Sequence, residues 1–283
     1  MTITRRPPWL RKKVSPALHG EMERLLAGLN LNTVCREAHC PNITECFAAG
    51  RATFLILGTA CTRRCSFCNV TKKQPLPPDH LEPVRIARAV QLLGLAHVVI
   101  TSPTRDDLPD GGAALYSAVV TEVHCASSAT TIELLIPDFL GRRVSLEKVV
   151  TSRPAIIGHN VETVPRLYAI RSGADYGRSL EVLGMIAQID PSLLTKSGIM
   201  VGLGEKEREV VAVLEDLRRA GCSYLSIGQY LAPSVAHYPV HEYVLPETFD
   251  RYRERALSLG FLHVESGPYV RSSYLAERYG TTR

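Results

Sequence analysis

Several kinds of segment are missing from this 283-residue sequence, and each absence narrows the classes of protein to consider. No apolar run reaches the roughly 18 to 20 residues that a membrane-spanning helix needs. The first residues include Arg and Lys but lack the apolar core of a secretory signal peptide. No stripe of aromatic residues interleaved with Arg suggests readout of a nucleic acid. We therefore expect a cytoplasmic protein that binds neither a membrane nor a nucleic acid.

Acidic side chains are also missing from the first thirteen residues. This arm contains five basic residues, Arg5, Arg6, Arg11, Lys12 and Lys13. The rest of the chain holds 28 basic and 28 acidic side chains, so the net charge of +5 comes from the arm. A basic arm on a neutral body can contact an acidic protein surface. A terminus that is merely solvated fits the sequence equally well.

Cysteine, in contrast, is plentiful, and six of the eight cysteines form two triads. In a chain without a secretion signal this number favours metal binding over disulfides. The triads are Cys61, Cys65 and Cys68, spaced C-x3-C-x2-C after an apolar run, and Cys35, Cys40 and Cys46, spaced C-x4-C-x5-C.

Thiolates bind both iron–sulfur clusters and zinc, so the ligand type alone leaves the metal open. Four cysteines are the usual complete ligand set of a four-iron cluster, and three would leave one iron open for another ligand. The two cysteines outside the triads, Cys125 and Cys222, are expected to be small residues that are buried or partly buried.

From residue 53 onward, strand-like apolar runs alternate with helical patterns. The runs cover residues 53–59, 97–102, 131–136, 155–160, 197–202 and 224–231. Between them, residues 83–93 open with Pro and stop at Gly94, and residues 205–220 place apolar side chains on one face, so both are predicted to be helices. Six strand–helix units predict a parallel sheet with right-handed crossovers.

The expected fold class is therefore α/β, as a partial (β/α)6 barrel similar to a TIM barrel, with N- and C-terminal extensions. We assign residues 1–50 to an N-terminal extension that carries the second cysteine triad. Residues 51–245 form the partial barrel, and residues 246–283 form a C-terminal extension with a helix, a short strand and a tail. Active sites of such barrels lie at the carboxyl ends of the strands.

The first triad, with aromatic Phe67 before its last cysteine, resembles the signature of the radical S-adenosylmethionine (SAM) enzymes. The longer run from Cys35 to Val70 resembles the lipoyl synthase family. Further blocks resemble that family in the same order: residues 105–113, 132–139, 159–167, 195–205, 227–231 and 271–274. The resemblance thus extends over nearly the whole chain.

The resemblance implies two four-iron, four-sulfur clusters and SAM as cofactors. The first cluster would sit on the triad at Cys61, with SAM chelating its open iron. An auxiliary cluster would sit on the triad at Cys35, and Ser273 of the Arg-Ser-Ser-Tyr motif would ligate its fourth iron. The implied reaction uses a 5′-deoxyadenosyl radical to take hydrogen from carbons 6 and 8 of an octanoyl-lysine. Sulfur from the auxiliary cluster then replaces each hydrogen.

Four residues are candidates to bind the nucleoside part of SAM. Asn160 and Glu162 end the fourth strand and have suitable chemistry for ribose hydroxyls, as in a similar segment of biotin synthase. The glycine-rich segment that includes Gly202 resembles the strand that the family places against adenine. Phe67 would offer its backbone to the adenine.

Charged residues near the strand ends have less certain roles. Arg178 or Arg171 would pair with the SAM carboxylate, which suits the fork of a guanidinium. Asp106, Asp107 and Asp110 resemble paired carboxylates for acid–base catalysis, but radical chemistry needs no such pair. We expect these three aspartates to serve loop structure or substrate contact.

Two alternatives remain open from the cysteine spacing alone. One is another two-cluster radical SAM enzyme that inserts sulfur, similar to biotin synthase or a methylthiotransferase. The other is a zinc-binding interaction module without catalytic activity. For the enzyme, the family implies an octanoylated lipoyl-carrier domain as partner and a small reduced carrier, such as ferredoxin or flavodoxin, as electron donor.

The two triads should be separable by mutation, because they lie on different segments. Replacing Cys61, Cys65 and Cys68 with Ala should abolish SAM cleavage and leave a four-iron cluster on the other triad. Replacing the triad at Cys35 should preserve SAM cleavage and abolish sulfur insertion. Iron and sulfide analysis, 5′-deoxyadenosine formation and mass spectrometry of the product measure these effects. Lipoyl product from the second variant would show that its triad is not the sulfur source.

Overall fold

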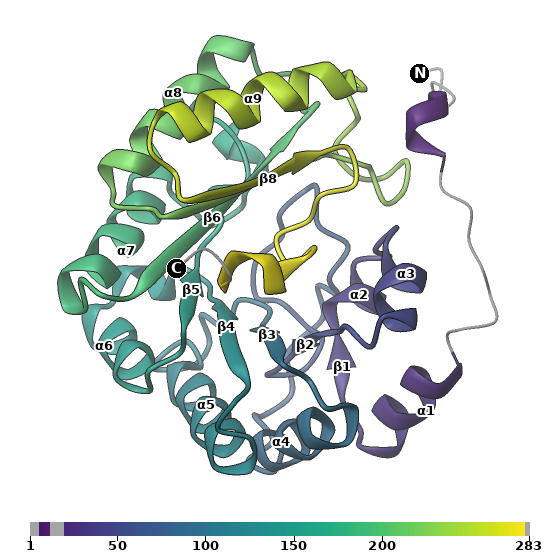
Figure 1. Cartoon of the computed structure of the whole chain (residues 1–283), viewed down its shortest axis with the longest axis vertical. Coiled ribbons are helices and arrows are strands. Elements are labelled where there is room, and N and C mark those ends of the chain that lie inside the picture. The colour runs from purple at the N-terminus through teal and green to yellow at the C-terminus, as the bar shows by residue number, and fades with distance from the viewer. Residues whose placement is uncertain (1–5, 12–19, 281–283) are drawn as a thin grey trace.

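A computed structural model of the chain, which describes residues 6–11 and 20–280, contains one eight-stranded sheet with strands in sequence order. Strands β2 to β8 are parallel and curl around a common axis, and β1 pairs antiparallel with β2 (Figure 1). The strands are β1 Asn32–Thr33, β2 Thr53–Leu55, β3 His97–Thr101, β4 Thr131–Leu135, β5 Ile156–Gly158, β6 Leu194–Val201, β7 Tyr224–Gln229 and β8 His263–Gly267.

Helices α4 to α9 form an outer layer around these strands, and α1 to α3 lie together on one side (Figure 1). The α-helices are α1 Gly20–Gly28, α2 Val34–Glu37, α3 Ile43–Ala48, α4 Glu82–Leu93, α5 Ala113–Ala126, α6 Arg143–Thr151, α7 Tyr176–Ile189, α8 Glu207–Arg219 and α9 Pro246–Ser258. Short 3-10 helices are η1 Pro8–Leu10, η3 Phe139–Gly141, η4 Pro165–Ile170 and η5 Ala276–Gly280. Of the helices in the described ranges, none is long and apolar enough to cross a lipid bilayer.

The predicted partial barrel is confirmed, and its six predicted strands correspond to β2 through β7. The sheet is longer than predicted, because α9 and β8 add a further parallel unit beside β7. Within the described residues β8 does not pair with β1, so the barrel stays open. The proposed boundaries at residues 50 and 245 remain a prediction.

Helix limits follow the expected signals. α4 begins with Pro83 in its first turn and ends at Gly94, whose φ of +57° is the left-handed conformation that terminates many helices. In α8 the apolar stripe Val210, Val213, Leu214 and Leu217 is buried against the sheet side of the barrel.

The two cysteines outside the triads differ in environment. Cys222 is buried, as predicted, but Cys125 is exposed, so the expectation of burial is wrong for it. Cys125 lies in the last turn of α5, whose buried stripe ends at Val123, and its side chain lies off that stripe.

The C-terminal segment returns to the inside of the barrel, where η5 lies within the ring of strands as a short yellow helix (Figure 1). The ring of Tyr279 is fully buried, and the Nζ atom of Lys196 lies 3.6 Å from its centroid. Nζ also donates a hydrogen bond of 2.8 Å to Glu133, which is 2% exposed. A cation–π contact and a buried ion pair therefore hold the end of the tail against β4 and β6.

Replacing Lys196 with Met should lower the free energy of unfolding by about 3–5 kcal/mol, because the buried Glu133 carboxylate would lose its lysine partner and keep only His97 Nε2, at 3.5 Å. Urea unfolding monitored by circular dichroism measures this change. Lys148→Met is the matched control, since Lys148 pairs with Asp110 with 42% of its side chain exposed. That control should cost about 0–1 kcal/mol. Equal losses in the two variants would contradict a stabilising role for the buried pair.

Candidate active site

The first cysteine triad lies in the long loop between β2 and α4, at the carboxyl end of the barrel. The loop is closed at its base by a hydrogen bond of 2.8 Å from the Cys61 N–H to the Thr71 carbonyl. Its tip is turned by a bond of 3.2 Å from the Cys68 N–H to the Cys65 carbonyl. Burial, and to a lesser extent the neighbouring Cys65 and Cys61 thiols, raise the pKa of Cys68 to about 12. All three cysteines thus lie on one loop whose base and tip are fixed by backbone hydrogen bonds.

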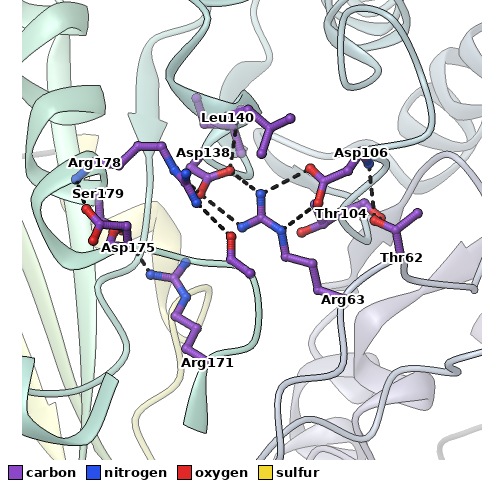
Figure 2. Close-up of polar contacts among 12 residues, drawn as sticks. Thr62, Arg63, Thr104, Asp106, Asp138, Leu140, Arg171, Asp175, Arg178 and Ser179 are labelled. Carbon is purple, nitrogen blue, oxygen red and sulfur yellow. Dashed lines mark hydrogen bonds and ion pairs between the residues drawn. The ribbon is translucent and has the colours of Figure 1, made fainter. Parts of the chain in front are cut away.

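Arg63, inside this loop, ties it to the next two strands. Its guanidinium lies between Asp106, which follows β3, and Asp138, which follows β4 (Figure 2). Arg178 of α7 reaches the other side of Asp138, with an Nε–Oδ2 distance of 2.8 Å. Burial raises the pKa of the Asp138 carboxyl, but the hydrogen bonds and charge of Arg63 outweigh it and lower this pKa.

The second triad is gathered by α2 and α3. Cys35 lies in α2, Cys46 in α3, and Cys40 in the turn between them. Burial raises the pKa of Cys35 to about 11, and burial with the nearby Cys40 and Cys35 thiols raises that of Cys46 to about 12. The Asn42 side chain donates a hydrogen bond of 2.7 Å to the Tyr269 carbonyl. This bond joins the turn to the C-terminal segment.

Ser273 lies beside the second triad. A cavity of about 40 Å³ is lined by Ser273 together with Cys35, Cys40 and Cys46. The Thr53 hydroxyl donates a hydrogen bond of 2.7 Å to Ser273 Oγ. Three thiols and one hydroxyl around a common space match the donor set of a four-iron cluster with one oxygen ligand.

A larger cavity of about 230 Å³ lies next to this group and touches both halves of the site. On one side it is lined by Cys35, Cys40 and Ser273, and on another by Asn160 and Glu162. Apolar side chains form a further part of its wall: Val34, Leu135, Ile199, Met200 and Val270. The polar residues Thr53, Ser226, Arg271 and Ser272 also line it. An apolar chain placed there would contact both groups of polar residues.

Asn160 and Glu162 are joined to each other and to the tail. Asn160 Nδ2 donates a hydrogen bond of 3.1 Å to Glu162 Oε1, and the Ser272 hydroxyl donates a hydrogen bond of 2.7 Å to Asn160 Oδ1. Burial raises the pKa of the Glu162 carboxyl, and the nearby Arg171 guanidinium opposes that shift. Glu162 also has a φ of +65°, which is uncommon for a residue other than glycine and marks a position under local constraint.

Across residues 6–11 and 20–280, no three His, Cys, Asp or Glu side chains are arranged to hold a single metal ion.

Comparison with known proteins identifies the family. Residues 55–228 match the family profile described as Radical SAM superfamily. The chain is 68% identical over 279 residues to a lipoyl synthase of Geobacter metallireducens, which covers 99% of both chains. The chain belongs to the lipoyl synthase family. A lipoyl synthase of Geotalea daltonii is 67% identical over 281 residues, covering 99% of this chain and 96% of that protein.

Solved structures support the fold of this lipoyl synthase. Streptococcus suis SuiB bound to S-adenosylmethionine superposes with a TM-score of 0.58 at 12% identity, covering 79% of this chain and 47% of that one. Methylornithine synthase (PylB) superposes with a TM-score of 0.55 at 15% identity, covering 86% of this chain and 70% of that one. At such identities the likeness shows the radical SAM barrel alone.

Within this lipoyl synthase the candidate SAM residues occupy different surroundings. Asn160 and Glu162 line the larger cavity, and Phe67 lies in the cysteine loop. Arg178 is engaged with Asp138, whereas Arg171 lies near Cys65 and Glu162, as its influence on their pKa values indicates. Arg171 Nη1 also donates hydrogen bonds to the Tyr168 hydroxyl and to Ser179 Oγ. The pairing of Arg178 or Arg171 with the SAM carboxylate stays a prediction.

Gly202, another candidate for SAM binding, sits in a tight turn after β6. Its φ is +95°, and a Cβ atom there would meet Gln229 and the Glu242 carbonyl. The Gly202 N–H donates a hydrogen bond of 2.6 Å to the Glu205 carboxylate. This turn therefore requires glycine for its own geometry, and the glycines that line the larger cavity are Gly198 and Gly228. The role of Gly202 in adenine binding stays a prediction.

The three aspartates act in loop structure, as expected. Asp106 pairs with Arg63, Asp107 pairs with Arg105, and Asp110 accepts from the Gly112 and Ala114 N–H groups at the start of α5. The sequence analysis missed Arg63 and Thr53, because nothing in the residues around them indicates which distant residues they contact. Only the folded chain brings Arg63 to Asp106 and Thr53 to Ser273.

Replacing Ser273 with Ala should leave the first cluster and SAM cleavage intact and abolish sulfur insertion, because the auxiliary site would lose its oxygen donor. Iron content, 5′-deoxyadenosine and lipoyl product measure the three effects. Ser272→Ala is the control and should keep sulfur insertion. Since it removes one hydrogen bond to Asn160, worth about 0.5–1.5 kcal/mol, it should weaken SAM binding by about tenfold or less.

Ser273→Cys provides a second comparison. A thiolate holds iron more strongly than the harder alkoxide, so this variant should keep the auxiliary cluster and stall turnover. Full activity of Ser273→Ala together with loss of sulfur insertion in Ser272→Ala would show that Ser273 is not the ligand and that Ser272 takes that role.

Proposed function

We propose that this chain inserts sulfur into an octanoyl chain held in the cavity of about 230 Å³ that the second cysteine triad shares with Asn160 and Glu162. The observation that carries the proposal is the composition of that cavity wall. Cys35, Cys40 and Ser273 supply one part, and Asn160 and Glu162 supply another. A substrate carbon in the cavity would lie between a sulfur source and bound SAM.

The donor groups suit two four-iron clusters, one on Cys61, Cys65 and Cys68 and the other on the second triad with Ser273. With both groups bound, the first site supplies an electron for SAM cleavage and the second supplies sulfur. The protein's own contribution is positioning. Asn160, oriented by Ser272, and Glu162 would bind the ribose hydroxyls and fix the direction of the nucleoside.

The apolar part of the cavity gives the substrate class. Leu135, Ile199, Met200 and Val270 offer no hydrogen-bonding side chain, so they suit an alkyl chain whose carbons carry no activating group. These side chains also exclude water, which would otherwise compete for a reactive radical. Family membership favours this substrate over the other sulfur-inserting reactions and over the zinc module raised by the cysteine spacing.

The substrate partner would be an octanoylated lipoyl-carrier domain, which must bring its modified lysine to the cavity mouth. Arg6 and Arg11 are exposed, and Arg6 lies near Tyr269 and Arg271 of the tail. The remaining basic residues of the arm, Arg5, Lys12 and Lys13, lie outside the described residues. Positive charge beside the tail suits an acidic carrier domain, and a small ferredoxin or flavodoxin would supply electrons.

The test is anaerobic reconstitution of the chain with iron and heavy-isotope sulfide, followed by SAM, a chemical reductant and an octanoyl-lysine peptide. Mass spectrometry should find a lipoyl product carrying the heavy sulfur, with 5′-deoxyadenosine formed alongside. Cys125→Ala is the matched control, because this exposed cysteine lies outside both triads and should leave the product unchanged. Formation of 5′-deoxyadenosine with no sulfur in the peptide would reject the proposed substrate.

A further inference from the structure

Arg63 makes two bidentate contacts from the middle of the first cysteine loop. To Asp106 the distances are 2.8 Å from Nε and 3.0 Å from Nη2. To Asp138 they are 2.9 Å from Nη1 and 2.6 Å from Nη2. The planar guanidinium thus uses both of its edges, which is the geometry that Arg provides and Lys does not.

The contact with Asp138 is shielded from water, whereas Asp106 has 29% of its side chain exposed. Arg63 is 7% exposed and Asp138 is 1% exposed, so both charges have exchanged solvent for each other. Exposed ion pairs contribute little, but breaking a buried pair leaves an uncompensated charge. Arg178, on the far side of Asp138, completes a group of two cations and two anions with no net charge (Figure 2).

This neutrality bears on the role of Arg63. A cluster held by three thiolates is anionic, and an isolated Arg beside it would act as a counter-charge. Here the charge of Arg63 is already matched by Asp106 and Asp138. The residue is therefore built for geometry rather than for charge compensation of the cluster.

Hydrogen bonds of residues 62 and 63 fix the segment between Cys61 and Cys65. The Arg63 N–H points to the Cys61 sulfur at 3.4 Å. The N–H of the neighbouring Thr62 donates a hydrogen bond of 3.0 Å to the Thr104 carbonyl. The Thr62 hydroxyl accepts a hydrogen bond of 3.1 Å from the Asp106 N–H. The chain between the first two cysteines is thus fixed to the ends of β3 and β4.

We propose that Arg63 is a positioning residue that fixes the orientation of the first cluster by bracing its loop against Asp106 and Asp138. The inference deepens the proposed function and rests on it, because it takes Cys61, Cys65 and Cys68 as the cluster ligands. Loss of the brace would let the loop move, so that the cluster is held less firmly and presents its open iron to SAM in several orientations. Partners that orient metal ligands typically change metal affinity about 10–100-fold when removed.

The experiment uses the full chain with Cys35, Cys40 and Cys46 replaced by Ala, so that the first cluster is observed alone. Arg63→Met and Arg64→Met are compared in this background. Arg64 is the matched control, because it has the same charge in the same loop but is exposed. Readouts are the rate of iron release to a chelator, the midpoint potential, and the electron paramagnetic resonance spectrum of the reduced cluster with and without SAM.

Arg63→Met should release iron about 10–100-fold faster and give a broadened spectrum with SAM, while Arg64→Met should match the unsubstituted background. Arg63→Lys should recover part of the iron retention, because it restores one cation without the second edge. If Arg63→Met does not fold by circular dichroism, Asp106→Asn takes its place, since it weakens one bidentate contact and leaves the buried Arg63–Asp138 pair. It should release iron at an intermediate rate.

A double variant separates geometry from charge. Arg63→Met with Asp138→Asn leaves Arg178 and Asp106, so the group is again neutral. The midpoint potential should return to that of the background while iron release stays fast. Slow release in the double variant would overturn the proposal in favour of a purely electrostatic role.

Equal release from Arg63→Met and Arg64→Met would also overturn the proposal. If the background protein itself holds no four-iron cluster, the ligand assignment fails, and that outcome is distinct from failure of the brace alone.

Discussion

Seven strands that run in one direction deliver their connecting loops to the same rim of the barrel. The first cysteine triad and the candidate SAM residues Asn160 and Glu162 depend on this constraint. The first cysteine loop follows β2, the two aspartates that receive Arg63 follow β3 and β4, and Asn160 follows β5. Since β2 to β5 are adjacent in the sheet, these four loops are neighbours in space.

The second triad reaches the same rim from outside the barrel, and it does so with the help of the tail. Asn42 holds the Tyr269 carbonyl, Ser273 meets Thr53, and Ser272 meets Asn160. The tail then continues into the barrel and ends with Tyr279 against Lys196. The position of Ser273 is thus set from both directions, by contacts at the rim and by an anchor inside.

Much of the site could be predicted from the sequence because its signals are local. The cysteines of each triad are a few positions apart, and Asn160 and Glu162 lie where a strand pattern stops. The alternation of strands and helices likewise predicted the barrel, although not that β8 would extend it. The environment of Cys125 was missed because burial at a helix end depends on side-chain direction rather than on residue type.

Contacts between distant residues could not be predicted in this way. Arg63 finds its partners 43 and 75 positions along the chain, and Arg178 finds Asp138 at a separation of 40. In the sequence Arg63 and Arg64 are equivalent, and only the packing of two loops buries one and exposes the other. The same limit explains why the contact between Arg178 and Asp138 could not be predicted from the sequence.

The hydrogen bond between Thr53 and Ser273 spans 220 positions and has a consequence for biosynthesis. Thr53 opens the first barrel strand, so it leaves the ribosome early, whereas Ser273 is translated after all the other strands. The contact can therefore form only after β8 and the tail have been made. A chain that lacked its last residues would keep both cysteine triads and lose the proposed oxygen donor.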